Sequence, residues 1–460
     1  MPATAFDSFY LRDRYGTREM RTIWDDRATI QRWLDVEAAL ALSEAELRLI
    51  PRSAARAISR AARVERLDLP AMRRAFDRTW NPVVPLVDAL RARLPAAAAR
   101  YVHWGATSRN IIDTALALQI RASHDVVSRE LERVGDALAR LALRHRDTLM
   151  AGRTHGQQAL PVTFGWKCAV WLDELMRHRE RLAASRARVL TGQFGGAVGT
   201  LAALGRSGPR VERRLMRRLG LGLPRLPVKT AGDRFAEFFL LLAMLSATLG
   251  KIGQNLYNLQ LGELDEVAES ARGKVGSSAM PHKLNPVASG SVVLLGRLLR
   301  GRATLMLDYV HAEGEDDHRQ GETAWAFPQE VCLLIGAQLA ISRKLLAGLV
   351  VKPRNMLRNL ERAGGVVVSE AVMMALAPRL GRDRAHELVL QLHRESLKRG
   401  VPFRDAVRRH PAVRAQLSPR RIEDALDYRR SLGLAGGFVD RVLRDWRRRA
   451  GRARRVRSSA

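Results

Sequence analysis

Two long apolar runs with helical spacing limit the folds that this chain can adopt. They are FAEFFLLLAMLSATLGKIGQNLYNLQLGELDEV, from Phe235 to Val267, and PVASGSVVLLGRLLRGRATLMLDYV, from Pro286 to Val310. Helices that are apolar nearly all round must be covered on several sides, by a bundle or by a subunit interface. Because helices of about 30 residues seldom form without such packing, we expect both runs to lie in the centre of a bundle.

Apolar residues recur at helical spacing along the rest of the chain as well, as in Ile30 to Leu47 and Val127 to Arg146. Strand-like alternation with turn dipeptides is scarce, so the chain is predicted to be all-α. Proline and glycine positions divide it into an N-terminal helical domain over residues 1–110, a central long-helix bundle over 111–350 and a C-terminal helical domain with a basic tail over 351–460.

Composition narrows the class of protein. The chain has 460 residues, 47% of them hydrophobic, which is enough to build a large core. The two cysteines, Cys168 and Cys332, lie in apolar helical patterns without metal-site or disulfide spacing. We therefore expect no metal and a cytoplasmic setting, and in the absence of a signal-peptide pattern or a long uninterrupted apolar run we expect no membrane span.

The formal net charge of +31 is typical of proteins that bind nucleic acids. The one dense cluster is the tail from Arg441 to Ala460, which holds nine Arg and one Asp, and the remaining excess is spread along helices. Charged blocks at chain ends are usually solvated, and neither interleaved aromatic residues nor a zinc finger is present. We therefore expect no nucleic-acid partner.

Three polar, glycine-flanked segments interrupt the helical pattern. In HWGATSRNIIDT, Thr107, Ser108 and Asn110 precede a helix that we expect to begin at Ile111, and free N–H groups at a helix start favour an anion. In AGRTHGQQALPVTFG, His155 is of the kind that moves a proton near neutral pH, and helical character resumes at Phe164. Taken alone, each segment is also compatible with an ordinary helix cap or a surface histidine.

The third segment is GSSAMPHKLNP, from Gly276 to Pro286. Its glycine and prolines favour a loop, and it gathers two serines, a lysine and an asparagine within a few residues. Ser277 or Ser278 suits a proton acceptor, Lys283 a positive charge for a carboxylate and Asn285 a directed amide. A plain linker rarely carries so many functional groups, so we interpret the segment as part of an active site.

Together these segments resemble the fumarase/aspartase superfamily, whose signature reads GSSxMPxKxNxxxxE. The match runs from RYGTREMRTIWDD through GATS, GRTHGQQ, GDRFAEF and GSSAMPHKLNP to AVMMALAPRLGR. The resemblance implies a homotetramer with a central bundle of long helices, in which three chains build each active site. It also implies removal of a group β to a carboxylate, or the reverse addition, through an aci-carboxylate carbanion and without metal or organic cofactor.

The resemblance also implies roles for individual residues. Ser277 corresponds to the general base, which would act as a partly activated alkoxide, and His155 to the general acid that protonates the leaving group. The substrate carboxylates would be held by Lys283, Asn285, Thr107, Ser108 and Thr154.

The residues point to two different branches of the superfamily. Arg14 and Tyr15, followed by EMRTIW, resemble the pair that contributes to nucleotide phosphate binding in adenylosuccinate lyases, and His155 agrees with that branch. By contrast, TWNPVVPLV (Thr79 to Val87) resembles 3-carboxy-cis,cis-muconate cycloisomerase, as does Gly290 in place of the final Glu of the signature.

Other positions divide the two branches further. A gapless reading back from Pro328 places Gln320 and Ala324 where adenylosuccinate lyases have a Ser and a phosphate-binding Arg. Bacterial cycloisomerases often carry Trp where this chain has His155, and Asn110 replaces the Asp of the usual TSxD in both branches.

We therefore expect a cofactor-free lyase or cycloisomerase that acts on a small polycarboxylate, with the cycloisomerase branch preferred. Adenylosuccinate lyase, which releases fumarate, is the alternative, and a related succinyl-compound lyase stays open. From a different class, a catalytically silent relative that binds an anion or a nucleic acid is the remote alternative.

Overall fold

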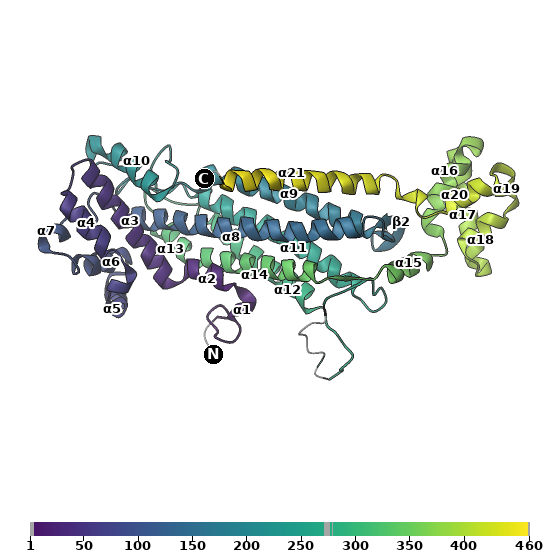
Figure 1. The fold of residues 1–460 in the computed structure, drawn as a ribbon, viewed down its shortest axis with the longest axis horizontal. Helices are drawn as coiled ribbons and strands as arrows, with labels where there is room; N and C mark the ends of the chain where they lie inside the picture. The colour runs from purple at the N-terminus through teal and green to yellow at the C-terminus, as the bar shows by residue number, and fades with distance from the viewer. Residues whose placement is uncertain (1–3, 271–276, 278, 459–460) are drawn as a thin grey trace. The chain divides into compact units, whose positions relative to one another are not determined.

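The computed structural model describes residues 4–270, 277 and 279–458. Within these residues the chain is almost entirely helical, as Figure 1 shows, and the all-α prediction is confirmed. The strands form two small antiparallel pairs, β1 (Leu149–Thr154) with β2 (Gln157–Thr163) and β3 (Val267–Ala268) with β4 (Val350–Val351).

The chain divides into two compact units, each assembled from three separate stretches of sequence. Unit 1 comprises Met1–Leu131, His178–Gly250 and Leu294–Ala340, and unit 2 comprises Glu132–Arg177, Lys251–Val293 and Ile341–Ala460. The long helices α8 (Ser108–Arg144), α9 (Phe164–Val189), α11 (Asp233–Leu259), α12 (Val287–Ala303) and α14 (Pro328–Ala347) each supply residues to both units. The three-region division along the sequence stays a prediction.

Unit 1 joins short N-terminal helices to parts of these long ones. Several starts are fixed by side-chain caps: Thr17, Asp25 and Asp68 accept hydrogen bonds from backbone N–H groups in the first turn of the helix that follows. The shorter helical elements of this unit are α1 (Arg12–Tyr15), α2 (Arg18–Trp24), α3 (Asp26–Glu46), α4 (Arg52–Ala61), η1 (Val64–Arg66), α5 (Leu69–Thr79), α6 (Val83–Arg91), α7 (Ala96–Ala99), η2 (Gly205–Ser207), α10 (Gly208–Leu219), η3 (Thr304–Leu307) and α13 (His318–Ala326).

One carboxyl group in the core of unit 1 is uncharged at neutral pH. Glu44 on α3 is fully buried, and neither of its carboxyl oxygens has a hydrogen-bond partner among the described residues. Burial, and to a lesser extent the nearby Glu37, raises the pKa of Glu44 to about 9. The folded protein therefore keeps a proton on Glu44 that the unfolded chain has already released.

This bound proton predicts a dependence of stability on pH. Between the usual glutamate pKa and about 9, the folded state binds one more proton than the unfolded state, so stability must fall as pH rises. We expect Glu44→Gln to increase the free energy of unfolding by at least about 2 kcal/mol near pH 8 and to change it little near pH 5. Urea unfolding at both pH values measures the difference, and parallel pH profiles for the two proteins would contradict the prediction.

Unit 2 contains the hairpin of β1 (Leu149–Thr154) and β2 (Gln157–Thr163) together with a C-terminal group of helices. Figure 1 shows α16, α17, α18, α19 and α20 gathered together, and their apolar side chains, including Leu376, Leu392 and Phe403, form one core. The helical elements confined to this unit are α15 (Pro353–Glu361), η4 (Val366–Val368), α16 (Ser369–Leu380), α17 (Arg382–Arg399), α18 (Phe403–Arg409), α19 (Pro411–Gln416), α20 (Pro419–Leu426), η5 (Arg430–Leu432) and α21 (Ala435–Ser458).

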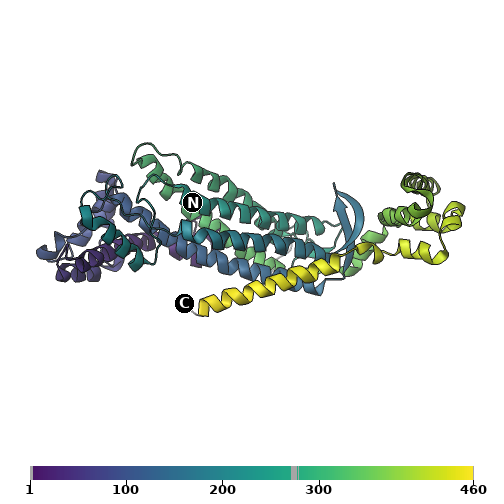
Figure 2. The same cartoon turned by 90° about the horizontal axis from the view of Figure 1, so that it is seen from above.

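The arginine-rich C-terminal segment is an uninterrupted helix, α21, shown in yellow in Figure 2. Its buried face packs against the last part of α8. Trp446 covers Gly135 so closely that a β-carbon there would lie 2.2 Å from the indole, and the Trp446 Nε1–H donates to Asp136 at 2.9 Å. This packing fixes the first half of α21 in unit 2.

The two apolar runs identified in the sequence are helices, although both are shorter than expected. The first is α11, which ends at Leu259, and the chain then turns through Asp265, whose φ is +47°. The second is α12, which ends at Ala303 and continues as a 3-10 helix to Leu307. The expected resumption of helix at Phe164 is confirmed by the start of α9.

In the part of the chain that the structure describes, two helical stretches are long and apolar enough to cross a membrane, judged by length and composition alone. They are Asp233–Leu259 and His318–Ala347, and the bent pair Pro353–Glu361 and Val366–Leu380 passes the same test when taken as one span. In the most apolar parts of the first two, 56% and 61% of the residues are already buried within the chain. Extensive coverage by other protein segments is what the sequence predicts for helices inside a bundle.

Candidate active site

The first candidate segment is a turn that leads directly into α8. This helix begins at Ser108, earlier than the Ile111 expected from the sequence, because the Asn110 side chain reaches back and accepts a hydrogen bond from the Thr107 N–H at 3.1 Å. The Ser108 hydroxyl accepts a second hydrogen bond, at 3.1 Å, from the Asn81 Nδ2–H. Two half-buried hydroxyls and an amide therefore surround the N-terminus of a long helix, an arrangement that favours a bound carboxylate.

Thr107, Ser108 and Asn81 line a cavity of about 350 Å³ in unit 1. Asn81 was not predicted to be a site residue. In the sequence it lies in TWNPVVPLV, a segment that was used only to compare the cycloisomerase and adenylosuccinate lyase branches. Trp80 and Trp325 add indole rings, and Trp80 is held exposed by a left-handed backbone conformation with φ of +50°. The lining residues are Trp80, Asn81, Pro82, Thr107, Ser108, Arg109, Ile112, Asp316, His318, Gly321, Glu322 and Trp325.

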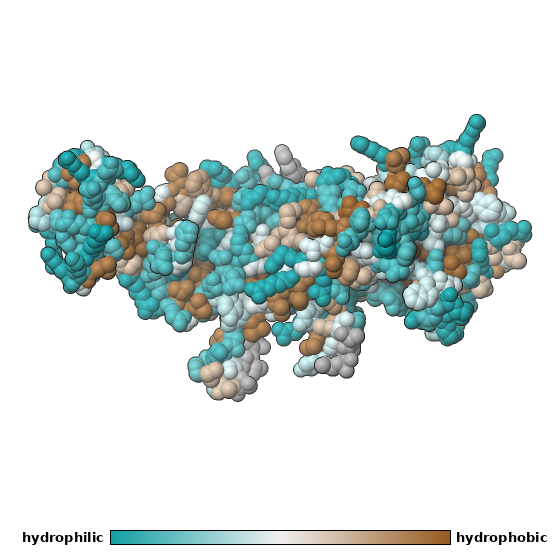
Figure 3. All heavy atoms as spheres, turned by 180° about the vertical axis from the view of Figure 1, so that it is seen from behind, coloured by the Kyte–Doolittle hydropathy of each residue, from teal (hydrophilic) through white to brown (hydrophobic). Residues whose placement is uncertain are grey.

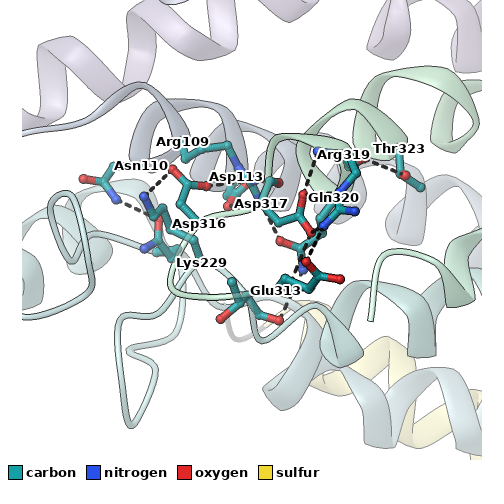
Figure 4. A network of polar contacts seen from close by, with 12 residues as sticks. Arg109, Asn110, Asp113, Lys229, Glu313, Asp316, Asp317, Arg319, Gln320 and Thr323 are labelled. Atoms are coloured by element: carbon teal, nitrogen blue, oxygen red, sulfur yellow. Dashed lines mark hydrogen bonds and ion pairs between the residues drawn. The ribbon is translucent and has the colours of Figure 1, made fainter. Parts of the chain in front are cut away.

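A network of ion pairs and hydrogen bonds around the buried Arg109, shown in Figure 4, lies beside this cavity, and Arg109 and Asp316 belong to both. Arg109 donates to both carboxylate oxygens of Asp113, at 3.3 and 3.2 Å, and also to Asp316 at 3.4 Å and to Gln320 at 3.2 Å. Burial opposes the charge on Arg109, but the surrounding acidic groups, led by Asp113, raise its pKa above the usual arginine value. Arg109 is therefore a permanently charged structural centre, already paired by acidic groups of the chain itself.

Gln320 and Ala324, the two positions compared with the Ser and the phosphate-binding Arg of adenylosuccinate lyases, are also buried. Gln320 is buried, and its Nε2 donates to the carbonyl oxygens of Tyr309 and Thr230, at 2.7 and 3.2 Å. Ala324 is buried as well and carries no polar group. Neither residue offers a free hydrogen-bond donor to a phosphate.

His155, the proposed general acid, lies at the tip of the β1–β2 hairpin in unit 2. Thr154 pairs with Gln157, so His155 and Gly156 form a two-residue turn, and both have positive φ, +50° and +80°. This is the backbone geometry of a type I′ turn, which matches the twist of the two strands. Thr154 and His155 are both exposed, and the hairpin projects the imidazole away from unit 2's own core.

A buried ion pair fixes the strand that leads to this turn. Arg153 precedes Thr154 on β1, and its guanidinium donates to both oxygens of Glu266, at 3.1 and 2.6 Å. The Glu266 side chain is fully buried and accepts a further hydrogen bond from Asn359 at 3.1 Å. The position of the His155 hairpin therefore depends on a carboxylate that lies far away in the sequence.

The third segment carries Ser277, whose hydroxyl oxygen accepts hydrogen bonds from the backbone N–H groups of Met280 and Ala279, at 3.2 and 3.3 Å. A further backbone bond, from the Ser277 N–H to the Lys283 carbonyl at 3.1 Å, closes the turn. Lys283 and Asn285 are exposed on the same loop. Gly276 and Ser278, which complete the signature, lie outside the described residues.

The loop is followed by a firmly capped helix. Glu269, which precedes the loop, accepts hydrogen bonds from the Ser289 N–H at 2.7 Å and the Ala288 N–H at 3.0 Å, in the first turn of α12. At Gly290, in contrast, a β-carbon would meet only the Tyr257 ring, at 3.8 Å. Packing therefore does not require a glycine where the signature has Glu.

The structure brings together some of the predicted site residues within one chain and leaves others apart. Thr107 and Ser108 share a cavity in unit 1, but Arg14 and Tyr15 on α1 do not line it; Arg14 is exposed, and the Tyr15 ring packs edge-on against Phe6. Within the described part of unit 2, no hydrogen bond or ion pair joins Thr154 or His155 to the loop that carries Ser277, Lys283 and Asn285.

Comparison with known protein families identifies the family to which the chain belongs. A family model described as lyase matches residues 14–297, and a model of the adenylosuccinate lyase C-terminus matches residues 365–442. The chain belongs to the fumarase/aspartase superfamily. It is thus an enzyme of the lyase and cycloisomerase class, as predicted from the sequence.

Relatives in this superfamily match almost end to end. An N-acetyl-S-(2-succino)cysteine lyase from Enterococcus italicus is 38% identical over 447 residues, covering 97% of this chain and 98% of the relative. An adenylosuccinate lyase from Methanothermobacter thermautotrophicus is 38% identical over 440 residues, covering 94% and 97%. The crystal structure of 3-carboxy-cis,cis-muconate lactonizing enzyme from Pseudomonas putida has a TM-score of 0.89 and 38% identity, covering 95% of this chain and 99% of that one.

Proposed function

We propose that this superfamily member catalyses β-elimination on a small succinyl compound that carries no phosphate, releasing fumarate. The observation that carries the proposal is the Ser277 turn. Two backbone N–H groups point at one serine oxygen, and such donors stabilise an alkoxide more than a hydroxyl. The reaction also needs a subsite that binds a substrate carboxylate, and the hydroxyls and amide at the start of α8 provide one.

In this mechanism the Ser277 oxygen removes the proton from the carbon next to a substrate carboxylate. The electron pair of the broken C–H bond moves into that carboxylate and gives an aci-carboxylate, which Lys283 and Asn285 stabilise. The pair then forms the C=C bond, and the bond to the leaving group breaks with its electrons on the departing atom. His155 donates a proton to that atom, and Thr107, Ser108 and Thr154 hold the substrate's carboxylates in place.

We also propose that these segments meet in a homotetramer with shared active sites. Two features support this: the hairpin and the Ser277 loop make no direct polar contact within the described part of unit 2, and the long helices carry exposed apolar side chains. Figure 3 shows apolar patches interrupting the hydrophilic surface, and Leu143, Val170, Met244, Tyr257 and Leu294 are among the exposed residues. Partner copies of the chain would cover such patches.

The absence of phosphate from the proposed substrate follows from the charges around the unit 1 cavity. Asp316 and Glu322 line it, and the cations next to it, Arg109 and Lys229, are already paired with carboxylates. Since Gln320 and Ala324 offer no phosphate donor, adenylosuccinate is a poorer fit than a smaller succinyl compound. The relative that acts by name on N-acetyl-S-(2-succino)cysteine indicates a thioether of this kind.

Cycloisomerisation of 3-carboxy-cis,cis-muconate, the function preferred from the sequence, is the second candidate. Asn81, within the WNP segment that resembles this branch, donates to Ser108 in the carboxylate subsite, and Gly290 leaves open the space of the usual Glu. The chemistry is formally the reverse addition, with the substrate's own carboxylate as the entering group. We propose that either reaction takes place in the cytoplasm, without a membrane or nucleic-acid partner.

A parallel assay separates these functions. The purified protein is incubated with N-acetyl-S-(2-succino)cysteine, 3-carboxy-cis,cis-muconate and adenylosuccinate, and absorbance reports formation or loss of the conjugated double bond. We expect kcat/KM for the succinyl thioether to exceed that for adenylosuccinate by about 100-fold or more, because the phosphate would meet acidic groups in place of arginine. Preferred turnover of adenylosuccinate would overturn the proposal, and turnover of the muconate alone would establish the second candidate.

A further inference from the structure

Helix α13 turns one face toward the cavity that contains Thr107 and Ser108. The residues of α13 that line this cavity are spaced three and four positions apart, so they form one row along the helix. We call them the α13 row, and its members are His318, Gly321, Glu322 and Trp325. The row is therefore one wall of the space into which a substrate bound at Thr107 and Ser108 extends.

The α13 row is held close to the start of α8 by its glycine. A β-carbon at Gly321 would lie only 2.9 Å from Nη1 of Arg109, which is itself held in place by its ion pairs. The same nitrogen donates to the Asp317 carbonyl at 3.2 Å, and the Asp317 side chain caps α13 by accepting from the Arg319 N–H at 3.0 Å. The wall and the carboxylate subsite are therefore joined directly within unit 1.

Glu322 is a carboxylate of this wall that no cation in the described part of the chain neutralises. The other acidic residue in the lining, Asp316, accepts from Lys229 at 2.5 Å with one oxygen and from Arg109 at 3.4 Å with the other (Figure 4). Arg109 also pairs with Asp113, so these two cations and two carboxylates balance one another. The Glu322 side chain is exposed and has no hydrogen-bond or ion-pair partner among the described residues. One negative charge therefore remains on the wall.

Two indole rings line the same cavity, Trp325 from the α13 row and Trp80 from the turn before α6. The side chain of Trp80 is 79% exposed, and its φ of +50° is rare for a bulky residue. Asn81 fixes this turn, because its oxygen accepts from the Val83 N–H at 3.0 Å while its Nδ2 donates to Ser108. Indole faces attract organic cations, and a carboxylate beside them supplies the counter-charge.

We propose that the leaving group of the substrate carries an ammonium group, which Glu322 and the two indole rings bind. The inference rests on the proposed function, because it takes Thr107 and Ser108 as the carboxylate subsite from which the leaving group extends toward the α13 row. A leaving group with a neutral end would leave Glu322 without a counter-charge, and one with only an anionic end would be repelled. Glu322 is thus a specificity residue that takes no part in proton transfer.

The test compares two synthetic thioethers, the succinyl adducts of cysteamine and of 2-mercaptoethanol. They are nearly the same size and differ in having an ammonium or a hydroxyl group at one end. At about pH 8 an ordinary alkylamine is charged and an ordinary histidine is neutral. We expect native kcat/KM to be higher for the cysteamine adduct by about tenfold or more.

The change in this ratio on Glu322→Gln carries the result, because the two thiols also differ as leaving groups. In Glu322→Gln the ratio should fall by about tenfold, while kcat/KM for the mercaptoethanol adduct stays within about threefold of the native value. Trp80→Leu should lower the ratio by about threefold. The matched control is Glu315→Gln, which removes an exposed carboxylate that precedes α13 but does not line the cavity, and it should keep the native ratio.

An unchanged ratio in Glu322→Gln overturns the inference, as does an equal fall in Glu315→Gln, which would show an effect of overall charge. If the native enzyme turns over both adducts equally well, or turns over N-acetyl-S-(2-succino)cysteine but neither adduct, ammonium recognition is refuted while the proposed function stands. If none of the three thioethers reacts, the proposed function is refuted and this inference with it.

Discussion

Replacement of Ser277 by alanine is expected to lower kcat by about three orders of magnitude or more, because the reaction loses its general base. The two N–H groups of Ala279 and Met280 that stabilise an alkoxide have no comparable effect on a methyl group. The effect belongs to the chemical step, so substrate binding should change little. Steady-state kinetics with the best substrate of the panel measures kcat, and isothermal titration with fumarate measures binding.

The matched control is Ser278→Ala, a change at the adjacent serine of the signature. If Ser277 is the base, Ser278→Ala should keep kcat within about tenfold of the native enzyme. Loss of activity in Ser278→Ala with a fully active Ser277→Ala would assign the base to the other serine. Equal and complete loss in both, accompanied by weaker fumarate binding, would mean that the loop is sensitive to any change and that the role of Ser277 is not catalytic.

Much of the fold can be read from the spacing of apolar residues. Helices longer than a few turns repeat that spacing many times, so α3, α8, α11 and α12 are all visible in the sequence. Their ends are less visible, because a single side chain decides them. The start of α8 depends on Asn110 reaching back to Thr107, which places the helix start ahead of the first apolar residue, Ile111.

The hairpin and the buried networks depend on contacts that sequence patterns do not contain. The β1–β2 turn uses His155 and Gly156, and a histidine at positive φ is not the Asn-Gly or Asp-Gly pair that marks such turns. The hairpin is held by Glu266, 113 residues from Arg153, and Arg109 meets Asp316 across 207 residues. The chemical segments were recognisable because they cluster reactive groups locally, whereas Asn81 and Glu322 reach the cavity only through the fold.

Loss of the Glu266 carboxylate is the second change with a large expected effect. In Glu266→Leu, Arg153 would keep its charge in a largely buried position without its bidentate partner. Removing one partner of such a pair typically costs about 3 to 5 kcal/mol, because the remaining charge is uncompensated. We expect the free energy of unfolding to fall by about that amount, and kcat to fall as well because the strand that leads to His155 loses its anchor.

A double-mutant cycle distinguishes this anchor from ordinary packing. Arg153→Leu should be strongly destabilising alone, but the double variant with Glu266→Leu should be much less destabilised than the sum of the two, since no unpaired charge is left. Glu423→Leu is the matched control in unit 2. Glu423 also accepts two hydrogen bonds from an arginine, Arg408, both at 2.8 Å, but its side chain is 56% exposed. Its loss should therefore lower the free energy of unfolding by less than about 1 kcal/mol. If the double variant regains stability but not kcat, the ion pair is replaceable as a source of stability while its geometry is required to place His155. Additive losses of stability would instead show that Arg153 and Glu266 act separately, and the hairpin would then need another anchor.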